Sequence, residues 1–284
     1  AKAVGVDERV FNEFNDRFSW RHLNYGVLTV PFTMDALGFT IRADGPYATH
    51  TIQSLFADTK LAVATDFSMA DVLIDFQKEP IEVTATAKRG EALSAVEVGF
   101  VGNWNEQRVW ETLPRLGVNQ STKNQWDELN GSTGSDDIFK VNLGFTPEGQ
   151  HIDVCYGQKV RTEHVSQKVD QIHYLAEEVG IAADQAAWLR DLFREFCLPP
   201  VTASMWTIST RPDQFRPVLK VTWANVPKKI VLKLMGDLAD VKDAPSRLDA
   251  LLAAANITND QIWRLTVEVG AEGRPKGSLS LRLD

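Results

Sequence analysis

The stretch that decides the fold spans residues 203–224 and reads ASMWTISTRPDQFRPVLKVTWA. Its two arms, residues 204–210 and 216–223, are rich in the β-branched and aromatic residues that favour strands. Between the arms, Arg211-Pro212-Asp213 is typical of a turn, because proline presets one backbone angle and aspartate bonds its own backbone. The stretch therefore predicts an antiparallel β-hairpin.

Four further segments repeat this pattern. The clearest is the second hairpin in chain order, where 81–88 and 92–100 alternate between apolar and other residues about an Arg89-Gly90-Glu91 turn. The remaining predicted pairs of strands are 26–31 with 37–43, 138–145 with 151–156, and 261–269 with 278–283.

The segments between the hairpins are mostly helical in pattern, since their apolar residues recur at helical spacing. One segment, 119–137, is rich in Ser, Thr, Asn and Gly, and we predict a loop there. The predicted helical ranges are 7–18, 47–61, 69–77, 105–116, 162–179, 182–197 and 230–255.

Five hairpins separated by helices make ten antiparallel strands in a pseudo-repeat of αββα units. Open sheet edges invite aggregation, and closing the sheet into a barrel removes them. One face of nearly every strand is apolar, so amphipathic helices must cover the outside. The sequence predicts an α+β fold, a ten-stranded antiparallel β-barrel with helices outside, as a single domain over 1–284.

Composition narrows the classes of partner. The net charge of −8 and the pI near 5.2 argue against a nucleic-acid-binding protein, which needs a basic surface. No run of apolar residues is long enough to span a membrane. The two cysteines, Cys155 and Cys197, match no metal-ligand spacing and favour a reducing compartment, the cytoplasm. We expect a monomer.

The polar face of each strand must look into the barrel. A ten-stranded barrel is too wide for such side chains to fill, so we predict a solvated lumen. Trp206 is the one tryptophan assigned to the lumen, because Trp223 and Trp263 fall on apolar faces. The residues predicted to face inward are Thr40, Arg42, Thr84, Thr86, Lys88, Glu97, Lys140, Asn142, His151, Asp153, Cys155, Trp206, Lys220, Thr222, Arg264, Ser280 and Arg282.

Several strings on these strands resemble a known family. Gly38-Phe39-Thr40-Ile41-Arg42, His151-Ile152-Asp153-Val154-Cys155-Tyr156 and Val218-Leu219-Lys220-Val221 are similar to strands of the ABBA-type, or PT-barrel, soluble aromatic prenyltransferases. The order and spacing of the hairpins match over essentially the whole chain. The resemblance implies the PT-barrel fold.

The resemblance also implies an activity, the transfer of a prenyl group from an allylic diphosphate to an aromatic small molecule or a peptide. The diphosphate would be held by six inward cations that come from all five hairpins and could converge near one end: Arg42, Lys88, Lys140, Lys220, Arg264 and Arg282. Trp206 would shield the allyl cation, and a base would take the acceptor's proton. The base candidates are Glu97, Asp153 and His151. The substrate-binding candidates are Arg42, Lys88, Lys140, Asn142, Trp206, Lys220, Thr222, Arg264 and Arg282.

The sequence departs from the family pattern at several positions. Ala95 stands where the family has Lys, Asp153 where it has Asn, and Cys155 where it has Tyr. Family members that use Mg²⁺ carry an Asp at the position of Gly38, so the resemblance implies an enzyme without metal, and we expect no cofactor.

Two other functions remain open. The first is a barrel enzyme that has lost diphosphate binding and uses Glu97, Asp153 and His151 for acid–base chemistry such as a cyclisation. The second is a binding protein for a small apolar ligand. The inward Lys and Arg residues could also simply pair with Glu82, Glu97 and Asp153 in a structural network, and Cys155 fits a small buried filler.

Overall fold

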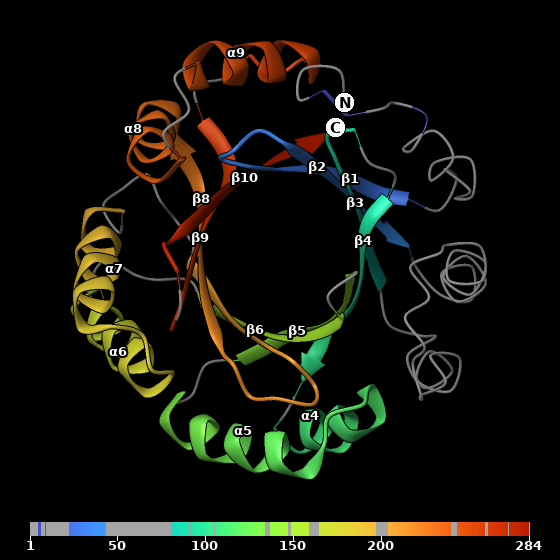
Figure 1. Cartoon of the computed structure of the whole chain (residues 1–284), viewed down its shortest axis with the longest axis vertical. Helices are drawn as coiled ribbons and strands as arrows, with labels where there is room; N and C mark the ends of the chain where they lie inside the picture. Colours follow the sequence, from blue (N-terminus) through green and yellow to red (C-terminus); the bar gives the residue numbers. More distant parts are fainter. Residues whose placement is uncertain are drawn as a thin grey trace.

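The ten predicted strands form a closed antiparallel barrel in the computed structural model, with the strand order β1-β10-β9-β8-β7-β6-β5-β4-β3-β2 (Figure 1). The structure describes residues 5–6, 9, 23–43, 81–90, 93–104, 106–133, 137–146, 149–158, 165–196, 204–239, 243–258, 261–271 and 273–283. The helices predicted over 7–18, 47–61 and 69–77 lie outside these residues, apart from Arg9.

Every predicted hairpin is present, and most strands extend by a few residues beyond their predicted ends. The strands are β1 Leu23–Pro31, β2 Ala36–Ala43, β3 Ile81–Lys88, β4 Leu93–Trp104, β5 Asp137–Thr146, β6 Gly149–Gln158, β7 Ser204–Thr210, β8 Val218–Pro227, β9 Gln261–Gly270 and β10 Lys276–Leu283.

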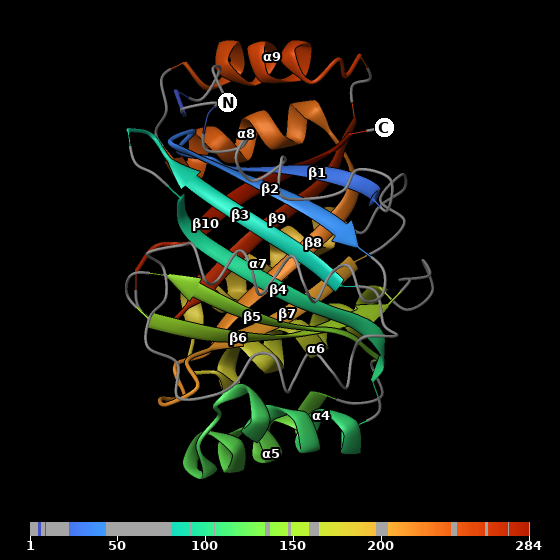
Figure 2. The same cartoon turned by 90° about the vertical axis from the view of Figure 1, so that its right-hand side faces the viewer.

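The described helices lie on the outer side of the barrel, at the top, left and bottom of the view in Figure 1 and again outside the sheet in Figure 2. Among the described residues, none of them combines the length and apolarity needed to cross a bilayer. The helices are α4 Glu106–Thr112, the 3₁₀ helix η3 Leu113–Leu116, α5 Gln120–Thr133, α6 Val165–Glu178, α7 Ala183–Phe196, α8 Lys228–Ala239 and α9 Ala244–Ala254.

The loop predicted over 119–137 is wrong, because α5 occupies most of it. Asn119 caps this helix, since its Oδ1 accepts a hydrogen bond of 2.8 Å from the Thr122 backbone N–H. Thr122, Trp126 and Leu129 then lie buried on one helical face. Capping and this narrow buried stripe outweigh the low helix propensity of the Ser, Thr, Asn and Gly residues.

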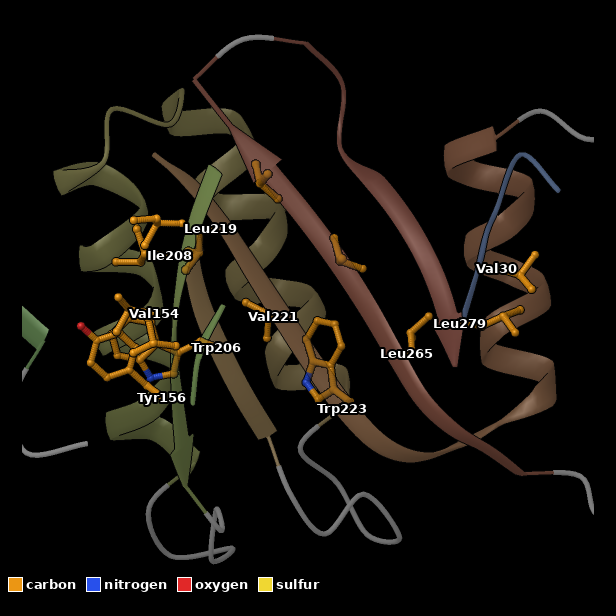
Figure 3. Packing of buried hydrophobic residues seen from close by; sticks show 14 of the residues in the cluster. Val30, Val154, Tyr156, Trp206, Ile208, Leu219, Val221, Trp223, Leu265 and Leu279 are labelled. Atoms are coloured by element: carbon orange, nitrogen blue, oxygen red, sulfur yellow. The ribbon is translucent and has the colours of Figure 1, made fainter. Parts of the chain in front are cut away.

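Successive side chains along each strand point alternately to the outer face of the barrel wall and into the lumen. Outward side chains such as Val83, Val98 and Val221 are fully buried between the barrel and the helices, and Figure 3 shows part of this apolar layer. Inward side chains are mostly polar and partly accessible. The hydrophobic core therefore lies outside the barrel wall, which leaves the lumen available for chemistry.

The barrel has two different ends. At the hairpin end, short turns join β1 to β2, β3 to β4, β5 to β6, β7 to β8 and β9 to β10. At the crossover end, longer connections, most of them helical in the described chain, join one hairpin to the next.

Candidate functional site in the barrel lumen

The lumen contains a cavity of about 390 Å³. Side chains and backbone from all ten strands line it, which is possible only because the barrel is closed. Among the described residues, four carboxylates line the cavity beside three Lys or Arg side chains: Glu82, Glu97, Asp153 and Glu268, with Lys140, Lys220 and Arg264.

All three base candidates and the cation candidate Lys220 form one cluster toward the hairpin end. His151 Nε2 lies 3.4 Å from Glu97 Oε1 and 4.0 Å from Asp153 Oδ1. Lys220 Nζ donates a 3.1 Å hydrogen bond to Asp153 Oδ2. We call Glu97, His151, Asp153 and Lys220 the lumen cluster. Acidic and basic side chains alternate through the cluster, so their titrations are coupled. A change in the charge of one member therefore changes the pKa of the others.

A glycine makes the contact between His151 and Glu97 possible. These residues lie on β6 and β4, and the intervening strand β5 places Gly144 directly between them in register. A Cβ on Gly144 would lie 1.9 Å from the His151 ring. The imidazole therefore reaches Glu97 by lying across bare backbone.

A second pair is built in the same way one strand further round the barrel. Lys140 on β5 reaches Glu82 on β3, with an Nζ–Oε2 distance of 2.5 Å. It crosses β4 at Gly99, where a Cβ would lie 2.1 Å from the Lys140 side chain. Lysine and carboxylate side chains are only 16% and 14% exposed.

The lumen cluster shifts the pKa of each member toward the charged form. Burial alone would raise the pKa of Glu97, but the hydrogen bond and charge of His151 lower it. Burial would likewise raise the pKa of Asp153. The positive charges of Lys220 and His151 outweigh this effect and lower the Asp153 pKa to about 2. The pKa values of His151 and Lys220 are raised, because their carboxylate partners outweigh desolvation. Glu97, Asp153 and Lys220 are therefore ionised near neutral pH, and His151 keeps its proton to a higher pH than an ordinary imidazole.

Cys155 does not share this activation. It is buried and its thiol is free. Burial raises the pKa of the thiol to about 11, although Lys140 nearby favours the thiolate. A protonated thiol is a poor nucleophile, so the structure agrees with a filler role.

The six predicted inward cations do not converge near one end. Lys88 is exposed at the last residue of β3, at the hairpin end, whereas Arg42 and Arg282 lie at the opposite, crossover end. Lys140 and Lys220 are engaged by Glu82 and Asp153. That prediction is wrong, because strand alternation fixes the face of a residue but not its height along the barrel.

The inward orientation predicted for Trp206 is also wrong. It pairs in register with Tyr156 and Val221, which lie on the outer face, and it stacks on Tyr156 with ring centroids 3.9 Å apart (Figure 3). On β7, Trp206 and Ile208 are buried outward while Thr207, which lines the cavity, faces inward. The alternation of these three residues in the sequence was enough to predict that Trp206 faces outward.

The aromatic residue that does line the cavity is Trp263, which we expected on the outer face. Ile262 and Leu265 are both fully buried outward, so two residues lie between them instead of one. The adjacent strand has a matching irregularity at Asn225, whose φ of 56° is left-handed. This local break in alternation turns Trp263 and Arg264 inward together, and the guanidinium lies 3.9 Å over the indole ring. No sequence pattern marks such a break.

Glu268 is a second lining residue that the sequence analysis missed. It is the register partner of Lys220 and contributes to the raised pKa of that lysine. Its alternation with Val267 and Val269 was a sufficient signal. The predicted residues Thr222 and Asn142 do line the cavity, and Thr222 bonds the Thr266 hydroxyl across the strands at 2.8 Å.

No protein-family model and no curated protein sequence matches the chain. Solved structures do match. The 5-dimethylallyltryptophan synthase from Streptomyces coelicolor superposes with a TM-score of 0.68 at 13% identity, over 99% of this chain and 93% of that one.

Two further solved structures match. The 6-dimethylallyltryptophan synthase from Micromonospora olivasterospora, in complex with DMASPP and Trp, gives a TM-score of 0.63 at 14% identity, over 90% of this chain and 81% of that one. AnaPT from Neosartorya fischeri gives 0.66 at 8% identity, over 92% and 78%. The closed barrel, its antiparallel order and these superpositions together show that the chain has the PT-barrel fold of the ABBA-type aromatic prenyltransferases.

Proposed function

We propose that the lumen transfers a prenyl group from an allylic diphosphate to a nucleophilic aromatic acceptor. The observation that carries the proposal is the polarity of the lumen within this fold. Glu97, Asp153 and His151 gather toward the hairpin end, while Arg42, Arg264 and Arg282 lie on strand segments toward the crossover end. A diphosphate requires the basic end, and proton removal requires the other.

The reaction would divide between these ends. The allylic carbon–oxygen bond breaks, and the arginines stabilise the charge that develops on the departing diphosphate. The acceptor forms the new carbon bond and then loses a proton to Glu97, which is ionised because His151 lowers its pKa. Trp263 takes the shielding role that the sequence analysis gave to Trp206, since its ring lines the cavity.

We further propose that the reaction needs no divalent metal and that the protein works in the cytoplasm, in keeping with the free thiol of Cys155. Gly38 lines the cavity at the position where metal-dependent relatives carry Asp. Turnover should therefore survive excess chelator. A rate that falls to background in EDTA and recovers with Mg²⁺ would contradict this part of the proposal.

The central test combines binding and turnover. Calorimetric titration with dimethylallyl thiolodiphosphate should show binding, and Arg264→Ala should weaken it by roughly 1–3 kcal/mol, the scale of a charge-assisted hydrogen bond. Incubation with dimethylallyl diphosphate and indole acceptors should give a product heavier by one prenyl unit. Neither binding nor product over a panel of chain lengths and acceptors would reject prenyl transfer.

One observation favours a second function, acid–base catalysis without a diphosphate. Lys140 and Lys220 are both paired with carboxylates, and carboxylates outnumber Lys and Arg in the lining of the described barrel. An incoming diphosphate would be repelled by Asp153 and by Glu82, which is the register partner of Arg42. A barrel that binds an indole but no thiolodiphosphate would support this second function.

A further inference from the structure

Two buried oxygen atoms of the lumen lack a hydrogen-bond partner among the described residues, namely Asp153 Oδ1 and Asn142 Oδ1. Asp153 is 3% exposed and Asn142 is 7% exposed. The two residues are direct register partners on β6 and β5, and both line the cavity. Two unpaired acceptors thus lie side by side on the wall of a cavity that a ligand can enter.

The protein groups near Asp153 and Asn142 leave these two oxygen atoms unpaired, although the side chain of Ser209, the register partner of Asp153 on β7, also hydrogen-bonds the Asp153 carboxylate. Lys220 donates to the other oxygen of Asp153, Oδ2, at 3.1 Å. His151 Nε2 lies 4.0 Å from Oδ1, which is beyond hydrogen-bond distance. The Asn142 amide nitrogen makes only a long contact of 4.0 Å to Cys155 Sγ. A buried acceptor left in this state is costly, so a complementary donor is expected there.

The chemistry of the donor follows from the two atoms and from the surrounding charge. Both atoms are acceptors, and Asp153 keeps its charge near neutral pH because its pKa is lowered to about 2. A phosphate or carboxylate on a ligand can donate nothing to either atom. Carboxylates also outnumber Lys and Arg in the lining of the described barrel, which favours a cationic donor over a neutral one.

We propose that Asp153 Oδ1 and Asn142 Oδ1 form a subsite for a protonated amino group of the lumen ligand. In terms of the proposed function, the amine belongs to the acceptor, so the acceptor is an aromatic amine or amino-acid derivative and the diphosphate lies elsewhere in the lumen. The subsite itself depends on the proposed function only for this identification, because it can be tested without any prenyl donor.

The test is calorimetric titration of the full chain, without donor, with three probes that share an indole ring. Tryptamine carries an ammonium group, 3-methylindole is neutral and indole-3-propionate is anionic. Tryptamine should bind about tenfold more tightly than 3-methylindole, the difference expected of one charge-assisted hydrogen-bonded contact. Equal affinities, or tighter binding of indole-3-propionate, would overturn the subsite.

Three variants separate a built subsite from general negative charge. Asp153→Asn should remove the preference for tryptamine, and Asn142→Asp should strengthen it while leaving the Lys220 contact in place, which keeps the test decisive if Asp153→Asn folds poorly. Glu268→Gln is the matched control, because it removes the same charge from the same cavity. A loss in Glu268→Gln as large as that in Asp153→Asn, or an unchanged preference in Asn142→Asp, would count against the subsite.

The result is distinguishable from a failure of the proposed function. A preference for tryptamine without any prenylated product leaves the subsite standing and rejects prenyl transfer. If 3-methylindole is prenylated and tryptamine is not preferred in binding, prenyl transfer stands and the subsite is rejected.

Discussion

Two ion pairs in the lumen share one construction and differ in chemistry. His151 reaches Glu97 across Gly144, and Lys140 reaches Glu82 across Gly99. Each pair spans three strands, because the glycine in the middle has no side chain in the way. The lysine pair is the shorter and more buried of the two, whereas the Glu97 side chain is 34% exposed and its partner is an imidazole.

The comparison separates a structural use of the motif from a functional one. Glu82 raises the pKa of Lys140 above the ordinary lysine value in spite of burial, so the lysine keeps its proton throughout the neutral range. The pKa of the His151 imidazole is raised too, but from an ordinary value of about 6.5, so it gives up its proton at a lower pH than the lysine does. A glycine on the middle strand therefore permits two kinds of pair in the lumen. Lys140 and Glu82 form a permanently charged structural pair, the brace, and His151 and Glu97 form a titratable pair next to it.

The largest expected effect comes from filling the two glycines. Gly99→Ala would force Lys140 away from Glu82 and leave two buried charges apart, so we expect a loss of about 3–5 kcal/mol in the free energy of unfolding. Gly144→Ala should cost less, about 1–3 kcal/mol, because His151 can move and lose its proton. Denaturant unfolding at neutral pH measures both. A larger loss in Gly144→Ala would reverse the assignment of brace and titratable pair.

The next effect is the dependence of stability on pH. The pKa of His151 is raised in the folded protein by Glu97 and Asp153. A raised pKa stabilises fully below the unfolded histidine pKa of about 6.5, and that contribution is lost as pH rises through the folded value. Unfolding free energy should therefore fall by up to about 1 kcal/mol across this window, the scale of a partly exposed ion pair.

Two variants isolate this contribution. His151→Gln should flatten the profile in that window, and Glu82→Gln should lower stability while leaving the slope intact, because the lysine pair does not titrate there. If the unfolding free energy of His151→Gln still falls with pH in this window, the pH dependence belongs to another of the five histidines.

The fold was predictable from the sequence because its signals are local and repeated. Alternation over 81–88 and 92–100 and the turn at Pro212 each specify a hairpin, and five hairpins constrain one another into a closed barrel. The prediction for 119–137 failed because α5 depends on Trp126, which is buried against the rest of the protein. Composition alone does not report such burial.

The candidate site was predictable only in part. The inward orientation predicted for Glu97, Asp153 and Lys220 is confirmed, since each lies between apolar neighbours that point outward. The predicted orientations of Trp206 and Trp263 were both wrong, the first because its alternation was misread and the second because alternation breaks beside it. Pairing across three strands was beyond the sequence, because it depends on register and on which strand places a glycine between two charges.

The smallest expected effect is also the sharpest test of the comparison. The coupling energy of each pair can be measured by a double-mutant cycle, with His151→Gln and Glu97→Gln for one pair and Lys140→Met and Glu82→Gln for the other. Each cycle is run at about pH 5.5 and about pH 8.5, on either side of the ordinary histidine pKa. At the lower pH the imidazole is charged and donates to a carboxylate, and once the pH passes the raised pKa of His151 the pair is reduced to an ordinary hydrogen bond. The coupling between His151 and Glu97 should therefore weaken by about 0.5 kcal/mol at the higher pH, while the coupling between Lys140 and Glu82 stays constant, since both of those groups remain ionised throughout. If both couplings changed together, the pH dependence would arise from a shared rearrangement of β4 and β5, and the two crossings could not be assigned separate roles.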